Sequence, residues 1–93
     1  MKTIKVYYNK NLKMTEGKLA AQCSHAVAGL VNQIGYDSNC KIIILEARQK
    51  KFYDLFAENV DKSIYMQVDL GYNEVKSNTE TAFAYLEEET QIK

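Results

Sequence analysis

The strongest constraint on the fold is a change in the spacing of apolar residues along the first half of the chain. Residues 3–9 alternate between apolar and polar side chains, which is typical of a β-strand. From Glu16 to about Ile34 the apolar residues recur every three or four positions, which predicts one long amphipathic helix. A second strand is predicted from Cys40 to Glu46. A strand, a helix and a strand in succession indicate an α/β fold.

The second predicted strand contains the apolar run Ile42-Ile43-Ile44-Leu45. An uninterrupted run of this kind, without alternation, is typical of a strand that is buried on both faces. We therefore expect this strand to lie in the centre of the sheet, with a helix on each side.

The rest of the chain predicts one more helix and two more strands. The helix spans residues 48–60, and Phe52 and Val60 belong to its apolar face. The strands span residues 63–68 and 79–86, with a loop at 70–78 between them. The order β-α-β-α-β-β predicts a three-layer α/β sandwich with a mixed four-stranded sheet. Because the chain has 93 residues, we expect a single domain over residues 1–93.

The composition excludes several classes of protein. An apolar content of 46% and a charged content of 26% are ordinary for a soluble globular protein. No apolar run reaches the length of a membrane span, and the first residues contain no apolar signal segment. We therefore expect a cytoplasmic protein that does not bind membranes and whose two cysteines are reduced. One histidine and two separated cysteines cannot form a dedicated zinc site, so we expect no metal.

The charges are distributed unevenly, although the net charge is zero. Residues 1–18 hold five lysines and one glutamate, whereas residues 69–93 hold six acidic residues and two lysines. A nucleic-acid-binding protein usually has a clear basic excess. Here the sequence offers only a local basic patch, formed by Lys10, Lys13 and Lys18.

The start of the long helix is the first candidate site. Thr15 is a suitable N-cap, which places Gly17 and Lys18 in the first helical turn. A lysine there opposes the positive end of the helix dipole, and glycine is a poor helix former. Two locally unfavourable residues side by side, next to free N–H groups, are typical of a site for an anion or a polarised carbonyl.

The faces of this helix separate the candidate residues. At 100° per residue, Lys18, Gln22 and His25 form one polar stripe opposite the apolar stripe that includes Cys23. A catalytic pair of Cys23 and His25 is therefore not supported, because residues two positions apart do not face each other. Each polar residue also has an ordinary structural explanation, such as an exposed helix position.

Taken together, these residues resemble the type 2 peptidyl-tRNA hydrolase family. The strongest match is the segment MTEGKLAAQCSHA at residues 14–26, directly after the first strand. A weaker match is Asp69-Leu70-Gly71, where the family has an Asp-x-Gly loop. The late threonine of the family, inside its last strand, is similar to Thr81.

The resemblance implies hydrolysis of the ester that joins a peptide to the 3′ ribose of tRNA, without a metal or another cofactor. Lys18 would stabilise the developing oxyanion. Asp69 would orient Lys18 or a water molecule and could act as the general base. Thr81 would hydrogen-bond the ester or the water. The substrate-binding residues implied by the resemblance are Gly17, Gln22, His25 and Asn73, with Lys10 and Lys13 at the phosphates of the acceptor end.

The chain departs from the family after the Asp-x-Gly loop. The family usually has Arg-Thr-Gln, or something close to it, where this chain has Tyr72-Asn73-Glu74. Asn73 cannot relay a proton as a hydroxyl can, and Glu74 would repel phosphate. Two hypotheses therefore stay open: a peptidyl-tRNA hydrolase, or an inactive relative that acts as a binding or assembly module. On both, the family resemblance and the small size of the domain predict a homodimer.

Overall fold

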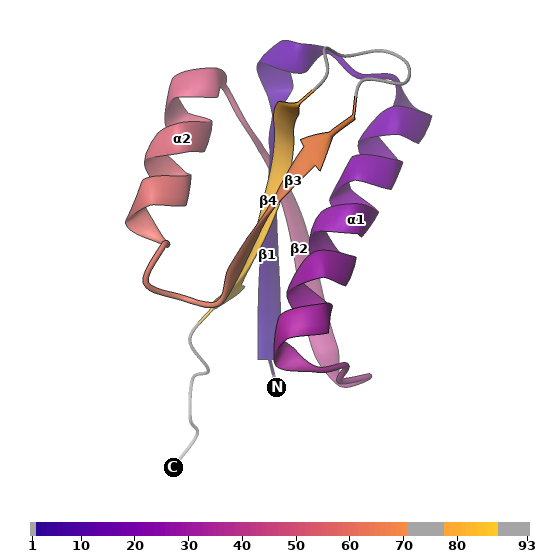
Figure 1. The fold of residues 1–93 in the computed structure, drawn as a ribbon, viewed down its shortest axis with the longest axis vertical. Coiled ribbons are helices and arrows are strands. Elements are labelled where there is room, and N and C mark those ends of the chain that lie inside the picture. The colour runs from indigo at the N-terminus through magenta and orange to yellow at the C-terminus, as the bar shows by residue number, and fades with distance from the viewer. Residues whose placement is uncertain (1, 71–77, 88–93) are drawn as a thin grey trace.

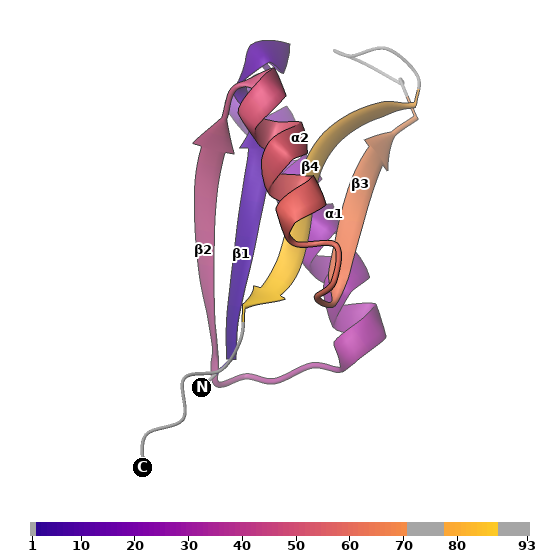
Figure 2. The same ribbon diagram turned by 90° about the vertical axis from the view of Figure 1, so that its left-hand side faces the viewer.

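The computed structural model describes residues 2–70 and 78–87 of the chain. One four-stranded sheet, with the strand order β2-β1-β4-β3, lies between two helices, α1 on one face and α2 on the other (Figures 1 and 2). β1 pairs in parallel with β2, whereas β4 is antiparallel to both β1 and β3. The predicted three-layer sandwich with a mixed sheet is thus confirmed. The elements are β1 (Lys2–Asn9), the 3₁₀ helix η1 (Lys10–Leu12), α1 (Glu16–Ile34), β2 (Cys40–Ala47), α2 (Gln49–Glu58), β3 (Ile64–Asp69) and β4 (Thr79–Glu87).

The ends of α1 follow from local sequence chemistry. Thr15 is the N-cap, and its side-chain oxygen accepts a hydrogen bond from the Lys18 N–H at 3.4 Å. Gly35 ends the helix with a φ of 87°, in the region that favours glycine. The second helix is shorter than predicted and ends at Glu58. Val60 therefore lies beyond it and is 55% exposed, so its assignment to the buried helix face was wrong.

β2 is an edge strand, so the prediction of a central position for it was wrong. β1 and β4 occupy the centre of the sheet instead. The side chains of Ile42 and Ile44 are 49% and 53% exposed. An apolar run can reflect burial on both faces, but here α1 packs mainly against β4 and β3, so the side chains of Ile42 and Ile44 are left largely uncovered.

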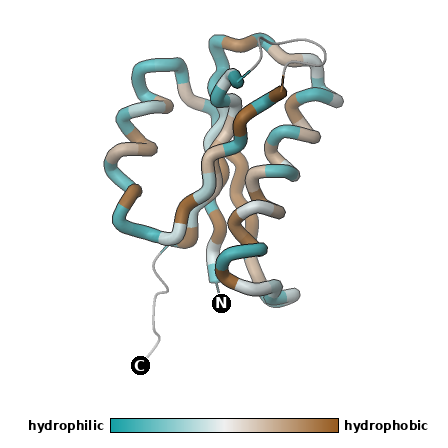
Figure 3. The backbone as a smooth tube through the Cα atoms, viewed as in Figure 1, coloured by the Kyte–Doolittle hydropathy of each residue, from teal (hydrophilic) through white to brown (hydrophobic). Residues whose placement is uncertain are grey.

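The core has one part on each face of the sheet. On the α1 side, Ile4 and Val6 of β1 pack against Ala26 and Leu30 of α1. On the α2 side, Phe52 packs against Phe83 with ring centroids 5.1 Å apart. Hydropathy colouring shows hydrophobic stretches along the strands and a mainly hydrophilic α2 (Figure 3), as expected for a helix with one narrow buried face.

Gly29 sets the distance between α1 and the sheet. A Cβ atom at this position would lie 2.4 Å from the ring of Tyr65 on β3, closer than any real contact. Glycine therefore lets the helix lie directly on this ring. The close approach places the first turn of α1 over the end of β3.

Candidate active site

The first turn of α1, the end of β3 and the start of β4 meet at one end of the sheet (Figure 1). Lys18 belongs to the first turn of α1, and Gln22 lies one turn later. Asp69 is the last residue of β3, and Thr81 is the third residue of β4. The fold thus brings together four residues of which the first and last, Lys18 and Thr81, are 63 positions apart in the sequence.

Lys18 and Asp69 form a close ion pair. The Lys18 Nζ donates a hydrogen bond to the Asp69 Oδ1 at 2.6 Å. The two side chains are only 10% and 6% exposed, so the charges face each other in surroundings with little water. A charged pair in such surroundings interacts more strongly than a pair on the surface. An ammonium group has three N–H donors, so contact with one carboxylate oxygen does not use its full capacity.

Gln22 links this ion pair to Thr81. The Thr81 hydroxyl donates to the Gln22 Oε1 at 2.6 Å, and the Gln22 Nε2 donates to the Asp69 Oδ1 at 3.4 Å. The hydroxyl also lies 3.4 Å from the carbonyl oxygen of Gln67. A carboxylate oxygen can only accept, so the amide nitrogen of Gln22 must face Asp69 and its oxygen must face Thr81. The direction of the hydrogen bonds from Thr81 to Asp69 follows from this constraint.

We predicted that the polar stripe of α1 lies opposite the core, and this prediction was wrong. Gln22 is 4% exposed and Ala26 is fully buried, whereas Val27 is half-buried. The buried face of α1 is therefore rotated from the Val27 side towards Gln22. The cause is that α1 packs on β4 and β3, where Thr81 and Asp69 provide polar partners for the side chains of this stripe.

The helix start lies beside the ion pair. The Thr15 side chain accepts from the Lys18 N–H, and the Leu19 N–H donates to the Thr15 carbonyl at 2.8 Å. By helix geometry the N–H groups of Glu16 and Gly17 point out of the helix end. Among the described residues, no atom lies within 4 Å of where a Cβ on Gly17 would be. The glycine is therefore not required by packing within this part of the chain, and its position leaves room near Lys18.

Cys23 and His25 lie apart from this cluster. His25 is exposed on the outer side of α1, beside the stripe of Lys18 and Gln22. Cys23 is buried on the apolar side, where burial raises the pKa of its thiol. A protonated thiol is a poor nucleophile, which agrees with the rejection of a pair between these two residues.

The predicted basic patch lies on and after η1. Lys10 pairs with Glu46 at 2.6 Å, with both side chains about half exposed. Lys13 follows η1 in a left-handed conformation, with a φ of 52°, and its side chain is exposed. Asn73 and its neighbours Tyr72 and Glu74 lie outside the described residues.

Sequence reasoning missed two residues that position the site. Asn11 accepts a hydrogen bond from the Gln49 N–H at 2.7 Å, which ties η1 to the start of α2 and places Arg48 near the patch. Gly29 sets the approach of α1 to β3, as described above. A glycine inside a strongly helical pattern was a usable signal for close packing, whereas nothing in the sequence pointed to the contact of Asn11.

The site offers an ammonium group, a carboxylate and a hydroxyl in one hydrogen-bonded row. No group of three or more His, Cys, Asp or Glu that could hold a metal occurs among the residues described. Within residues 2–70 and 78–87, no helix is long and apolar enough to cross a membrane. A carboxylate beside an ammonium group can accept a proton from water while the cation stabilises a developing oxyanion.

Comparison with known proteins is consistent with this chemistry. A family model described as "Peptidyl-tRNA hydrolase PTH2" matches residues 3–92 of the 93-residue chain. The match covers every strand and helix named above except the first residue of β1. No curated protein matches the chain.

Proposed function

The chain belongs to the peptidyl-tRNA hydrolase PTH2 family, and from this premise we propose that it hydrolyses the ester bond between a peptide and the 3′ ribose of tRNA. The observation that supports this proposal most directly is the buried pair of Lys18 and Asp69, with 2.6 Å between Nζ and Oδ1. Family membership alone does not establish activity, since a fold can be kept without its chemistry. The ion pair supports the proposal because it supplies a carboxylate that can act as a base and a cation that can stabilise an oxyanion.

We assign the central roles to the two charged residues. Water attacks the carbonyl carbon of the ester, and Asp69 accepts the proton of that water. The carbonyl oxygen becomes an oxyanion, which the Lys18 ammonium group stabilises. When the tetrahedral intermediate collapses, the bond to the ribose oxygen breaks and this oxygen takes up the proton that Asp69 accepted. The new peptide acid releases its remaining proton to water. The products are a free peptide carboxylate and tRNA.

Gln22 and Thr81 hold the carboxylate in place for this step. The Thr81 hydroxyl fixes the orientation of the Gln22 amide, and the amide nitrogen then donates to the Asp69 Oδ1. A carboxylate held by two donors keeps one geometry relative to the ester. Gly17 is exposed in the first turn of α1, next to Lys18 in the sequence, and the exposed His25 stays a candidate substrate contact farther along the helix.

The acceptor end of tRNA would approach from the basic patch. Lys13 and Arg48 are exposed beside η1, and Lys10 is held by a half-exposed ion pair with Glu46. A phosphate can replace a carboxylate partner at such an exposed pair, because solvent already weakens it. We further propose that the protein acts as a homodimer, as the family resemblance implies, and in the cytoplasm, where peptidyl-tRNA is formed.

The test is the release of peptide from a peptidyl-tRNA. The release is detected as a change in the mobility of the tRNA on an acid gel. We expect turnover by the wild-type chain and a loss of at least about 100-fold in kcat for Lys18→Met and Asp69→Asn. Lys50→Met, which removes an exposed lysine of α2, is the matched control and should keep full activity. Turnover that survives the removal of Lys18 would contradict its assigned role.

A folded wild-type chain that shows no turnover would favour the second hypothesis, an inactive relative that acts as a binding or assembly module. The departure Tyr72-Asn73-Glu74 is the sequence feature behind this alternative. Replacing these three residues by Arg-Thr-Gln, the usual residues of the family, should then restore turnover if the remaining site is intact.

A further inference from the structure

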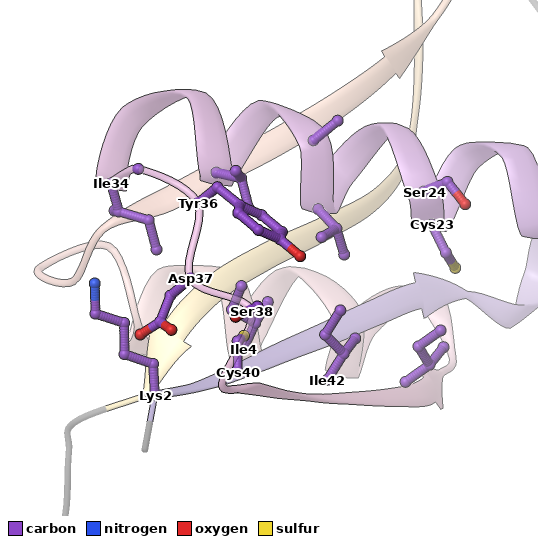
Figure 4. A pocket seen from close by; sticks show the side chains of 15 residues that line it. Lys2, Ile4, Cys23, Ser24, Ile34, Tyr36, Asp37, Ser38, Cys40 and Ile42 are labelled. Atoms are coloured by element: carbon purple, nitrogen blue, oxygen red, sulfur yellow. The ribbon is translucent and has the colours of Figure 1, made fainter.

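A long apolar groove lies between α1 and the edge strand β2, away from the row of Lys18, Gln22 and Asp69. Its volume is about 510 Å³. Figure 4 shows Cys23 and Ile34 on α1 facing Ile42 on β2, with the ring of Tyr36 between helix and strand. The groove exists because α1 packs over β4 and β3 and leaves the neighbouring face of β2 uncovered.

The apolar surface of the groove is unusually exposed for side chains of this type. Ile42 and Ile44 are 49% and 53% exposed, and Tyr36 is 81% exposed. In the parallel register Ile42 and Ile44 lie beside Ile4 and Val6, which form part of the core on the same face. A contiguous exposed apolar surface of this kind marks a binding site.

The groove leads towards the catalytic end of the molecule. A second hollow of about 290 Å³ continues it and shares the lining residues Cys23, Ser24 and Ile44. A third hollow of about 210 Å³ shares Leu19 with the second and is otherwise more polar, with Lys10, Lys13 and Glu46 in its lining. The first two hollows therefore follow the β2-facing side of α1 from Ile34 to Glu16 in its first turn, and the third continues from Leu19 to η1. Lys18 lies between Glu16 and Leu19 in the sequence.

We propose that this groove binds the peptide part of the substrate, while the ester lies at Lys18 and Asp69. The proposal rests on the proposed function. A hydrolase of peptidyl-tRNA must accept many peptide sequences, and an apolar surface binds varied side chains without demanding particular hydrogen bonds. RNA is a poor occupant of the first two hollows, because Lys2, at the far end, is the one cation among the residues that line them.

The length of the groove sets the length of peptide that it can hold. Leu19 and Ile34 line its two ends and are 15 residues apart on α1, which corresponds to about 23 Å along the helix axis. An extended peptide covers about 3.3 Å per residue, so the groove accommodates about seven residues. Affinity should therefore rise with peptide length and then reach a plateau.

Steady-state kinetics with two substrates test this proposal. One carries a single N-acetyl-leucine on tRNA, and the other carries a leucine-rich octapeptide. Ile44→Asp should raise the KM for the octapeptide about tenfold and leave kcat and the short substrate unchanged. Val60→Asp, which alters an equally exposed apolar residue outside the groove, is the matched control. Ile42→Ser is a milder second variant, should Ile44→Asp fail to fold.

A direct binding measurement separates this proposal from the proposed function. Fluorescence anisotropy of labelled leucine-rich peptide amides, from two to twelve residues long, needs no turnover. Binding that strengthens up to about seven residues and is lost in Ile44→Asp supports the groove, even if no ester is hydrolysed. Absence of peptide binding, or equal effects of Ile44→Asp and Val60→Asp, overturns it. A third result also overturns the proposal. If light scattering shows that the wild type is a dimer and Ile44→Asp a monomer, and if the KM is unchanged, a second copy of the chain covers the groove.

Discussion

Removing the Lys18 ammonium group while Asp69 stays charged should destabilise the fold strongly. The two side chains are 10% and 6% exposed, and 2.6 Å separates Nζ from Oδ1. Unit charges at this distance attract each other by about 6 kcal/mol at an effective dielectric constant of about 20. The loss of hydration on burial cancels part of this attraction. Since Lys18→Met removes the cation that faces the buried Asp69 carboxylate, we expect the free energy of unfolding to fall by about 3–5 kcal/mol.

The pair of Lys50 and Asp54 provides an internal control. Its Nζ–Oδ2 distance is 2.9 Å, close to that of the buried pair, but its side chains are 90% and 50% exposed. Solvent already screens these charges, so Lys50→Met should leave the free energy of unfolding almost unchanged. The double variant Lys18→Met/Asp69→Asn should regain most of the stability lost in Lys18→Met, because the buried carboxylate charge is then removed together with its cation. The asparagine can still accept the hydrogen bond from Gln22.

Urea unfolding followed by circular dichroism gives the free energy of unfolding for each variant. The wild type, Lys18→Met, Asp69→Asn and the double variant form a double-mutant cycle that isolates the coupling between the two side chains. Equal losses in Lys18→Met and Lys50→Met would refute the reasoning, because the Lys18 ammonium group would then be no less hydrated than a surface lysine. A coupling energy below about 0.5 kcal/mol would do the same.

Three further substitutions test the packing around this pair. Thr81→Val removes the 2.6 Å hydrogen bond to Gln22 and leaves a buried amide oxygen without its donor; we expect a loss of about 1–3 kcal/mol in unfolding free energy, measured in urea, and a lower kcat. Gly29→Ala pushes a methyl group into the ring of Tyr65, 2.4 Å away, and should cost about 1–3 kcal/mol in the same measurement. Gly17→Ala meets no described atom within 4 Å and should stabilise α1 by up to about 1 kcal/mol, while steady-state kinetics should show a higher KM if substrate needs the space beside Lys18.

Much of the fold could be predicted because local chemistry and periodicity agree along most of the chain. Thr15 and Gly35 mark the two ends of α1 in the sequence, and the structure places them there. The order of strands and helices followed from the apolar spacing alone. Lys18 was conspicuous because a lysine in the first turn opposes the helix dipole, and its ion pair with Asp69 supplies the interaction that compensates for this position.

The position of β2 could not be predicted from its own residues. Ile42 and Ile44 are as apolar as a buried strand requires, but burial depends on where the helices lie, and that is decided by other contacts. Gly29 lets α1 approach Tyr65 on β3, and this draws the helix away from β2. The apolar side chains of β2 favour burial, but no part of the described chain covers them on the α1 side.

The position of α1 over β3 and β4 also explains why the prediction placed Lys18 and Gln22 on the side of the helix that faces away from the core. Periodicity defines the faces of a helix relative to one another, but not the rotation of the helix against the sheet. Because α1 lies over β3 and β4, its polar stripe is turned inward and its apolar stripe is turned partly towards the groove. Gln22 becomes buried, and this is tolerated because Thr81 and Asp69 satisfy both ends of its amide. One helix displacement thus creates both features of the proposed function: the polar row that would cleave the ester, and the apolar groove that would hold the peptide.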